Sequence, residues 1–343
     1  MAASLREVAA KAGVSVRTVS NVVSGSAPVA AATRERVQQV LDELQYRPNF
    51  AARQLRGGRT GLVGLVVPEL SSPYFAELAG LFVDAALERS WTLLIDQSGG
   101  TAEGERRLLE GSGRRVLDGL VLSPWALPPE DLTRYAGEHP LVVLGERDPH
   151  GVADHVSVDN VAAAHVVTTH LLATGRTRIA AVGVQPHLAN ATAAQRLLGH
   201  RQALADAGRT PDPALEVAVS TLHRAEGARA VRELLDAPHP PDAVFCFSDQ
   251  LALGALRAAR ERGVRVPEDL ALAGFDDIED GRYATPSLTT VAPDKQQIAA
   301  RALQCLADRL AGRGSAVAQR VVVPHRLVVR ESTGRATAGP APR

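Results

Sequence analysis

The segment that decides how this chain folds runs Val8-Ala9-Ala10-Lys11-Ala12-Gly13-Val14-Ser15-Val16-Arg17-Thr18-Val19-Ser20-Asn21-Val22-Val23. Gly13 permits the left-handed backbone that a sharp turn between two helices needs. Ser15 can cap the second helix, because its hydroxyl can accept a hydrogen bond from a free backbone N–H. The pattern therefore predicts a short helix, a tight turn and a second helix, which together form a helix-turn-helix.

The first helix has a recognisable beginning. Ser4 is followed three residues later by Glu7, and this spacing predicts a capping box in which each residue satisfies a backbone donor of the other. Leu5, Val8 and Ala9 then form one apolar face at helical spacing. We expect this face to pack against the second helix.

The second helix shows an inner and an outer face. The residues predicted to point inward are Val19, Val22 and Val23. On the outer face, Arg17 can bind the two acceptors of a guanine, Asn21 can pair with an adenine edge or a phosphate, and Val16 can contact a thymine methyl. The alternative is that Arg17 and Asn21 are ordinary solvated residues on a helical hairpin.

A third helix is predicted from Ala31 to Leu44, with Arg34 and Arg36 on its outer side. Its start is weak, because Ala30 stands where a Ser or Asp cap is expected. The next stretch reads Tyr46-Arg47-Pro48-Asn49-Phe50-Ala51-Ala52-Arg53-Gln54-Leu55, in which Pro48 ends the helix and Asn49 can cap another. So short a helix is not stable alone in water. We expect it to be ordered only when DNA or a partner subunit supports it.

These motifs resemble the head of the lactose-repressor (LacI/GalR) family of transcriptional regulators. The matching positions are Gly13-Val14-Ser15, Thr18-Val19-Ser20, Thr33-Arg34 with Val37, Tyr46-Arg47-Pro48-Asn49, Ala52-Arg53 and Leu55. The resemblance implies that residues 49–55 form a hinge helix in the minor groove and that Leu55 wedges between the central base pairs, kinking the duplex. The alternative for Leu55 is packing within a linker. The expected DNA contacts are Ser15, Val16, Arg17, Thr18, Ser20, Asn21, Thr33, Asn49, Ala52, Arg53 and Leu55.

Charge is unevenly distributed along the chain. The 343 residues carry no net charge, yet residues 1–60 hold nine basic and four acidic side chains, a balance of +5 that leaves −5 for the rest. A basic head favours contact with phosphates, and its affinity for DNA should fall with salt. The N-terminus lacks the pattern of a signal peptide, and no apolar run approaches the ~20 residues that span a bilayer. The sequence therefore predicts a cytoplasmic protein without a membrane partner.

Neither a metal site nor a catalytic site is expected. The two cysteines, Cys246 and Cys305, are far apart, so they predict buried, reduced thiols rather than a disulfide framework or a CxxC metal site. His165 and His170 lie five residues apart, which is not the spacing of a metal pair. A nucleophile elbow, a P-loop and a dinucleotide-binding glycine motif are all missing from the sequence. We therefore expect no enzyme activity and no cofactor.

Beyond the glycine-rich joint at residues 57–60, short apolar runs alternate with amphipathic stretches of helical length. The predicted strands are residues 61–67, 92–95, 119–122, 141–144, 179–184, 215–219, 243–247 and 270–273. The predicted helices include residues 75–89, 161–172, 194–207 and 251–262. Such alternation predicts parallel sheets covered on both faces, and so many strands fit two sheets better than one.

The family resemblance implies the domain organisation. It gives a helix-turn-helix domain (1–47), a hinge helix and linker (48–60) and a two-lobed α/β core (61–334) similar to periplasmic binding proteins. The N-terminal lobe would take residues 61–160 and 291–323, and the C-terminal lobe 161–290 and 324–334. Residues 335–343, rich in Gly, Pro and Ala, are expected to be a disordered tail. The tail has no leucine heptads, so a homodimer is expected, and its two-fold symmetry would suit a palindromic operator.

An effector cleft is expected between the lobes, at the ends of the strands. By resemblance, the N-terminal lobe would contribute Tyr74, Phe75, Ser123 and Trp125. The C-terminal lobe would contribute Asn190, Thr192, Arg196, Leu222, Ser248 and Asp276. Leu222 and Ser248 depart from the family, in which an aromatic residue and an asparagine are common at these positions. The alternatives are that Arg196 and Asp276 form a structural ion pair or are solvated loop charges, and that Tyr74 and Phe75 are core residues.

The sequence thus predicts a DNA-binding regulator, by default a repressor of carbohydrate-utilisation genes that a sugar-like effector releases. One alternative is a corepressor-dependent regulator that senses a nucleobase or nucleoside, or a phosphocarrier protein. A sugar-binding transport receptor is a remote alternative, since it would need a signal peptide and would have no use for the head.

Overall fold

The computed structural model describes residues 3–24, 27–46, 59–111, 116–136, 139–186, 191–314 and 317–334. The chain divides into two compact units, Met1–Thr60 and Gly61–Arg343. The predicted hinge helix (residues 49–55) and the predicted tail (residues 335–343) lie outside the described residues.

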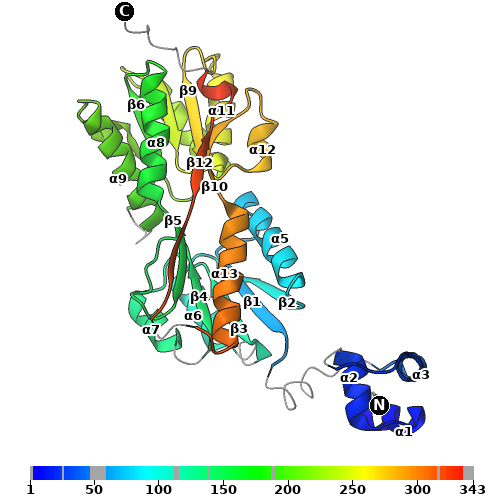
Figure 1. Ribbon diagram of the computed structural model, residues 1–343. Helices are drawn as coiled ribbons and strands as arrows, with labels where there is room; N and C mark the ends of the chain where they lie inside the picture. The colour runs from blue at the N-terminus through cyan, green and yellow to red at the C-terminus, as the bar shows by residue number, and fades with distance from the viewer. Residues whose placement is uncertain are drawn as a thin grey trace, which may run out of the picture. The chain divides into compact units, whose positions relative to one another are not determined.

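The described part of the N-terminal unit forms three helices (Figure 1), which pack around a small apolar core. The helices are α1 (Leu5–Ala12), α2 (Val16–Ser24) and α3 (Ala31–Glu43). One valine from each helix, Val8, Val19 and Val37, is completely buried. This packing confirms the helix-turn-helix and the third helix.

The hydrogen bonds at the helix ends follow the predicted capping pattern. The Ser4 hydroxyl accepts from the Glu7 N–H at 3.3 Å, and the Glu7 carboxylate accepts from the Ser4 N–H at 2.6 Å, so the capping box is confirmed. Gly13 adopts the left-handed region, with φ of 65°. The Ser15 hydroxyl accepts from the Thr18 N–H at 3.0 Å at the start of α2. Ala30 makes no side-chain cap at the start of α3.

Four side chains of this unit differ from their expected exposure or role. Val16 is half-buried against the small core rather than free on the outer face, and Asn21 is also half-buried. Val23 is only partly buried. Arg36 remains exposed, but its Nε donates to the Ala12 carbonyl at 3.1 Å and so closes the C-terminal end of α1. Because α2 is short and the core small, residues beside the inward stripe also touch the core.

The described residues of the second unit form two six-stranded sheets, and the sequence predicted the division into two sheets. The first sheet has the order β11-β5-β4-β3-β1-β2, and the second has the order β12-β10-β9-β8-β6-β7. Every neighbouring pair is parallel except β10 with β12. The strands of the first sheet are β1 (Leu62–Val67), β2 (Thr92–Gln97), β3 (Gly119–Leu122), β4 (Leu141–Leu144), β5 (Asp154–Val158) and β11 (Arg320–Val323). Those of the second are β6 (Ile179–Val184), β7 (Glu216–Ala218), β8 (Ala243–Cys246), β9 (Ala271–Phe275), β10 (Thr289–Pro293) and β12 (His325–Val328).

Helices cover both faces of the first sheet. Helices α5 (Pro73–Leu87) and α13 (Lys295–Leu310) pack side by side on one face (Figure 1). Helices α6 (Ala102–Glu110) and α7 (Pro129–Ala136) supply Leu109, Leu132 and Tyr135 to the core on the other face. Consecutive residues of β1 accordingly enter different cores, Leu65 on the α5 side and Val66 on the α6 side. This burial on both faces explains why the central strands are continuous apolar runs.

The second sheet carries its own helices. These are α8 (Asn160–Ala173), α9 (Ala191–Asp206), α10 (Arg224–Leu235), α11 (Asp249–Glu261) and the short α12 (Glu279–Arg282). Two 3₁₀ turns, η2 (Pro213–Leu215) and η3 (Glu331–Thr333), complete the elements. We call the first sheet with its helices the first lobe, and the second sheet with its helices the second lobe.

The chain passes between the lobes three times, at Asp159, Asp294 and Pro324. Asp159 caps α8 by accepting from the Ala162 N–H, and Asp294 caps α13 by accepting from the Gln297 N–H, both at 2.9 Å. Two crossings are joined directly, since the Asp294 N–H donates to the Pro324 carbonyl at 3.0 Å. The second crossing follows β10, three residues later than the boundary expected at residue 291.

Four strands were not predicted from the sequence, namely β5, β10, β11 and β12. The other eight were predicted with ends that differ by two residues or fewer. Cys246 and Cys305 are both buried free thiols, which confirms that expectation. Among the residues described, no helix is both long and apolar enough to cross a membrane.

Candidate functional site

A cavity lies between the two lobes, at the carboxyl ends of their strands. The first lobe lines it with residues from the loops after β1, β3 and β4, from β5 and from α5 and α13. The second lobe lines it with residues from α9 and from the loops after β7, β8 and β9. This is where open α/β sheets place their ligand sites.

The cavity brings together nine of the ten residues predicted for the effector. They are Tyr74, Phe75, Ser123, Trp125, Thr192, Arg196, Leu222, Ser248 and Asp276. The tenth, Asn190, lies outside the described residues.

Aromatic rings form one wall of the cavity. Tyr74 meets Phe75 edge to face, with ring centroids 5.1 Å apart, and Phe75 lies 5.9 Å from Trp125. Phe75 is 7% exposed and belongs to the core of the first lobe as well as to the cavity. It therefore has both of the roles that the sequence presented as alternatives.

Arg196 is held rigidly at the base of the cavity. Its Nε donates to the Asn160 Oδ1 at 2.7 Å, and another guanidinium nitrogen donates to the Phe247 carbonyl. The guanidinium also lies over the Phe275 ring, 3.5 Å from its centroid. Burial lowers the pKa of Arg196, and the nearby Asp276 opposes this effect. These contacts hold the guanidinium in one orientation at the lining of the cavity.

Asp276 stands on a strained turn after β9. Both Asp276 and Asp277 have positive φ, 118° and 49°. The turn is anchored, because the Asp276 N–H donates to Val291 at 2.8 Å and the Ile278 N–H donates to the buried Asp249 at 3.0 Å. Strain of this kind persists only where surrounding contacts hold it, and it is common at ligand sites.

The Asp276 carboxylate belongs to the lining of the cavity. Among the described residues, no hydrogen bond reaches it, and no ion pair within 4 Å joins it to Arg196. Burial raises the pKa of Asp276 to about 7, against the lowering effects of Arg196 and Lys295. The structural ion pair considered from the sequence is therefore not formed.

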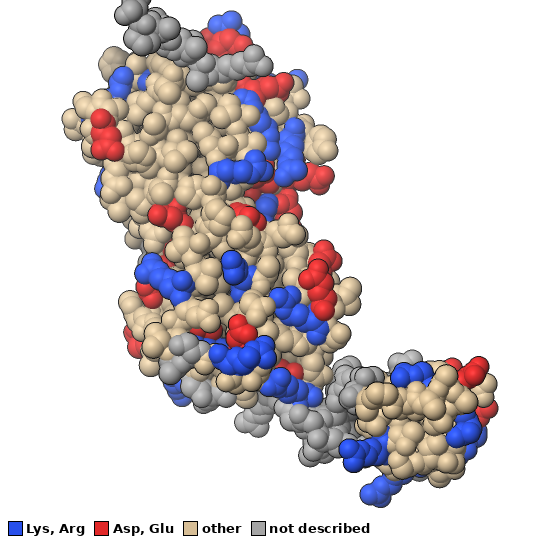
Figure 2. All heavy atoms as spheres, in the orientation of Figure 1, with Lys and Arg blue, Asp and Glu red and all other residues tan. Residues whose placement is uncertain are grey.

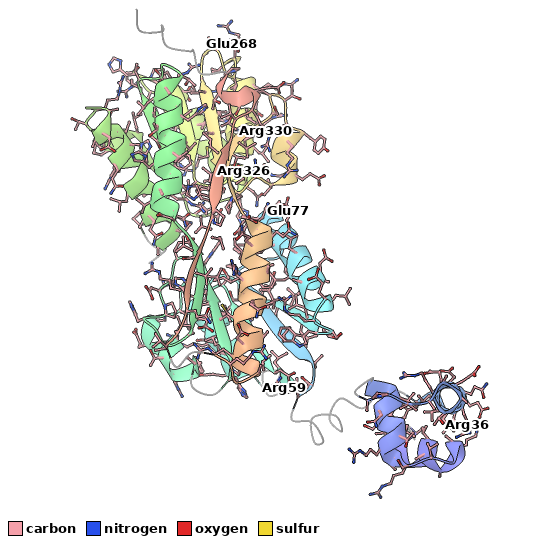
Figure 3. The ribbon with its side chains drawn as sticks, viewed as in Figure 1. Arg36, Arg59, Glu77, Glu268, Arg326 and Arg330 are labelled. Carbon is pink, nitrogen blue, oxygen red and sulfur yellow. The ribbon has the colours of Figure 1, made fainter. Side chains whose placement is uncertain are left out.

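Two acidic residues of the first lobe were missed by the sequence analysis and reach the second lobe. Glu146 accepts hydrogen bonds from Asn160, at 2.5 Å, and from the Thr192 hydroxyl. Glu69 lies 3.1 Å from the His223 imidazole. Both acids stand two residues after a strand that was predicted, so polar residues at strand ends could have identified them. A third, Glu77 on α5, is labelled in Figure 3. It accepts from the Glu279 N–H of α12 at 2.8 Å and pairs with Lys295.

Ser248 and Leu222 are joined to each other. The Ser248 hydroxyl donates to the Leu222 carbonyl at 2.9 Å and accepts from the Leu251 N–H at 3.1 Å, which caps α11. Ser248 thus shapes the wall of the cavity. The sequence also missed Ser157 and Gln250, which line the cavity too. Ser157 lies on β5, a strand that was not predicted.

The DNA-contact candidates in the N-terminal unit differ in exposure. Arg17 is exposed, whereas Thr18, Ser20 and Thr33 are half-buried. The hydroxyls of Ser15 and Thr18 bond to each other at 2.8 Å. Figure 2 shows basic side chains projecting from this unit, and the exposed arginines among its described residues include Arg6, Arg17 and Arg34. The candidates Asn49, Ala52, Arg53 and Leu55 lie outside the described residues.

Within the described ranges, no group of three or more His, Cys, Asp or Glu side chains could hold a metal ion.

Comparison with known proteins gives matches along nearly the whole chain. Residues 4–49 match the model of bacterial regulatory proteins of the lacI family, and residues 168–333 match that of the periplasmic binding protein-like domain. The HTH-type transcriptional regulator DegA of Bacillus subtilis is 32% identical, over 97% of this chain and 98% of DegA. The HTH-type transcriptional repressor CytR of Escherichia coli is also 32% identical, over 97% of this chain and 96% of CytR.

Two solved structures share the two-unit architecture. The Lac repressor dimer bound to operator and the anti-inducer ONPF is 25% identical, with a TM-score of 0.84 over 97% of this chain and 99% of that chain. The complex of the transcriptional regulator CelR with cellobiose is 34% identical, with a TM-score of 0.71 over 96% of this chain and 99% of that chain.

Proposed function

The chain belongs to the LacI family of bacterial regulatory proteins and is a DNA-binding transcriptional regulator, and we propose that it represses carbohydrate-utilisation genes until a sugar-like effector enters its cleft. Such a repressor would act in the cytoplasm, where the DNA is. The relatives DegA and CytR are regulators of transcription.

One observation carries the choice of a sugar. The cavity brings the aromatic rings of Tyr74, Phe75 and Trp125 together with the donor Arg196 and the acceptor Asp276. A sugar ring offers an apolar face that stacks on aromatic rings, and its hydroxyl groups both donate and accept hydrogen bonds. The related CelR was solved with cellobiose bound, which supports this ligand class.

The cavity also suits an allosteric response. Glu146, Glu69 and Glu77 link the first lobe to the second, so a ligand that changes the lobe arrangement must change these contacts. A ligand that binds one arrangement more tightly shifts the population toward it. We propose that this shift changes how the two hinge segments of a homodimer meet a palindromic operator, and that the residues 49–55, with Leu55, make the minor-groove contact.

A corepressor-dependent regulator that senses a nucleobase or nucleoside is the second candidate. The aromatic wall could stack on a planar base, and the Asp276 carboxylate could accept from a ring N–H. The two candidates differ in the sign of the response, because a corepressor strengthens DNA binding whereas an inducer weakens it. Sensing of a phosphocarrier protein would instead require no small molecule.

In the test, the purified protein selects the duplexes that it binds from a randomised DNA pool at near-physiological salt. Its affinity for the recovered sequence is then measured by titration with and without candidate effectors. Recovery of a palindrome with a central C·G step, released by cellobiose or another sugar, supports the proposal. Binding that appears only when a purine, pyrimidine or nucleoside is added favours the corepressor. DNA affinity that responds to a phosphocarrier protein and to no metabolite would contradict both ligand classes.

A further inference from the structure

The loop after strand β3 carries Trp125 and forms neither helix nor strand. Three successive backbone N–H groups in this loop, those of Trp125, Ala126 and Leu127, point at one carboxylate, that of Glu105 on helix α6. The Trp125 N–H donates to one carboxylate oxygen at 2.7 Å, and the Leu127 N–H donates to the other at 2.6 Å. The Ala126 N–H lies 3.3 Å from both oxygens. Both oxygens of Glu105 are therefore bonded to the backbone of a single loop.

Glu105 is an unusual side chain for a protein interior. It is completely buried, and among the described residues no Lys, Arg or His lies within 4 Å of its carboxylate. Burial raises the pKa of Glu105, while the hydrogen bonds from the loop and the charge of Arg147 act in the opposite direction. A buried carboxylate is costly unless it is fully hydrogen-bonded, so this side chain and the loop depend on each other.

Other contacts hold the same tryptophan. The Arg147 Nε donates to the Trp125 carbonyl at 3.0 Å, so both polar groups of the Trp125 backbone are fixed. A Cβ added to Gly100 would lie 2.8 Å from an indole carbon of Trp125, which means that the ring rests directly on this glycine. The ring also lies 5.9 Å from the Phe75 ring, and Trp125 lines the cavity.

We propose that Glu105 is a positioning residue for the effector: its carboxylate fixes the 123–127 loop so that the Trp125 indole forms the aromatic wall of the cavity. Glu105 does not line the cavity and acts through Trp125. The inference rests on the proposed function, because it assumes that the effector binds against this wall.

The chain offers a spectroscopic test, since it contains only two tryptophans, Trp91 and Trp125. In a Trp91→Phe background, the fluorescence comes from Trp125 alone. Glu105→Gln keeps the size of the side chain but replaces one acceptor with a donor that opposes the loop N–H groups. Glu110→Gln is the matched control, because Glu110 lies on the same helix and accepts from the Tyr135 hydroxyl of α7 rather than from the loop.

The expected result for Glu105→Gln is a red-shifted Trp125 emission and at least about a two-fold larger acrylamide quenching constant, because a loop without its hydrogen bonds opens more often. Glu110→Gln should leave both values unchanged. Unchanged emission and quenching in a folded Glu105→Gln protein overturn the proposal, as does an equal change in both variants. If Glu105→Gln does not fold, Glu105→Asp decides by the same two criteria, because its carboxylate is one methylene too short to reach all three N–H groups.

Cellobiose separates this inference from the proposed function. If cellobiose protects Trp125 from acrylamide in the Trp91→Phe protein, the same protection in the Glu105→Gln variant should require about a ten-fold higher cellobiose concentration. This factor corresponds to the loss of a few hydrogen bonds. Equal requirements in the two proteins would overturn the role of Glu105 in binding. If no sugar protects Trp125, the sugar effector fails, while the emission and quenching data still decide whether Glu105 positions the loop.

Discussion

The His223 imidazole lies 3.1 Å from a carboxylate oxygen of Glu69, and this pair joins the second lobe to the first. Glu69 also lines the cavity, so the contact stands at its edge. Opening of the lobes would separate the two side chains. The pair thus favours the arrangement in which the two lobes contact each other beside the cavity.

Substitution of His223 should shift the lobes toward the open arrangement. Because both side chains are partly exposed, His223→Gln should cost only about 0.2–1 kcal/mol, which is up to roughly five-fold in the population. The measurement is the distance between spin labels at Glu103→Cys and Glu268→Cys, one in each lobe, in protein diluted with unlabelled chains. His165→Gln is the control, because its pair with Asp206 lies within the second lobe at 2.9 Å. Equal shifts in the two variants would refute the link.

The stability of the core should depend on pH through Asp276. Its pKa of about 7 lies above the ordinary value of 3.8, so the folded protein binds a proton that the unfolded chain has already released. Stability contributed by this group is therefore lost as the pH rises from about 4 to about 7. Asp276→Asn should raise the free energy of unfolding at pH 8 by about 1–3 kcal/mol relative to wild type, and by little at pH 4.

Calorimetry of the wild-type and Asp276→Asn proteins at pH 4 and pH 8 tests this pH dependence of stability. The expected gain corresponds to a melting temperature higher by about 2–10 °C at pH 8. A difference that is the same at both pH values would mean that Asp276 does not titrate in this range.

Arg196 and Arg201 lie on the same helix but should respond differently to replacement by lysine. Arg196→Lys removes the planar fork that serves Asn160 and the Phe247 carbonyl, so we expect a loss of about 1–3 kcal/mol in stability because buried acceptors lose their donor. Effector affinity should fall as well. Arg201 pairs with Glu216 at the surface, so Arg201→Lys should cost less than about 1 kcal/mol. Similar losses in thermal unfolding would contradict the role assigned to Arg196.

Substitutions at the start of α2 should distinguish residues that stabilise the N-terminal unit from residues that recognise DNA. Ser15→Ala removes the cap on the Thr18 N–H and should lower stability by about 1 kcal/mol. Arg17→Ala should leave stability unchanged and weaken binding to the selected operator by about 1–3 kcal/mol. Binding must be compared at one fixed salt concentration. Loss of stability in Arg17→Ala would show that its contacts are structural.

The central strands and most long helices could be predicted because their side chains repeat an apolar pattern. Strand β5 could not, since Asp154, His155 and Ser157 are buried in it and a strand with buried polar residues looks like a loop in the sequence. The burial of Asp154 depends on a bidentate ion pair with Arg309, which is 155 residues away in the chain. Strands β11 and β12 are short and lie at sheet edges, so their patterns are weak.

The residues of the cavity, like the strands, were predicted only in part. Resemblance to the family indicated Arg196 and Asp276. It did not indicate that Asn160 and Phe247 hold the arginine, or that Asp276 makes no side-chain hydrogen bond to any other described residue. Glu105 was missed for another reason. A glutamate in an amphipathic helix is ordinarily exposed, and only the three-dimensional path of the 123–127 loop reveals its partners.

The three crossings have a consequence for synthesis of the protein. Strand β11 is an edge strand of the first sheet, and β12 is an edge strand of the second. The other strands of the two sheets lie within residues 62–158 and 179–293. Helix α13, which covers the first sheet, also comes from the C-terminal part. A ribosome that has made 290 residues has therefore completed neither lobe. Nascent chains should expose apolar sheet surface until helix α13 and strands β11 and β12 have emerged, a stage at which chaperones and proteases compete with folding.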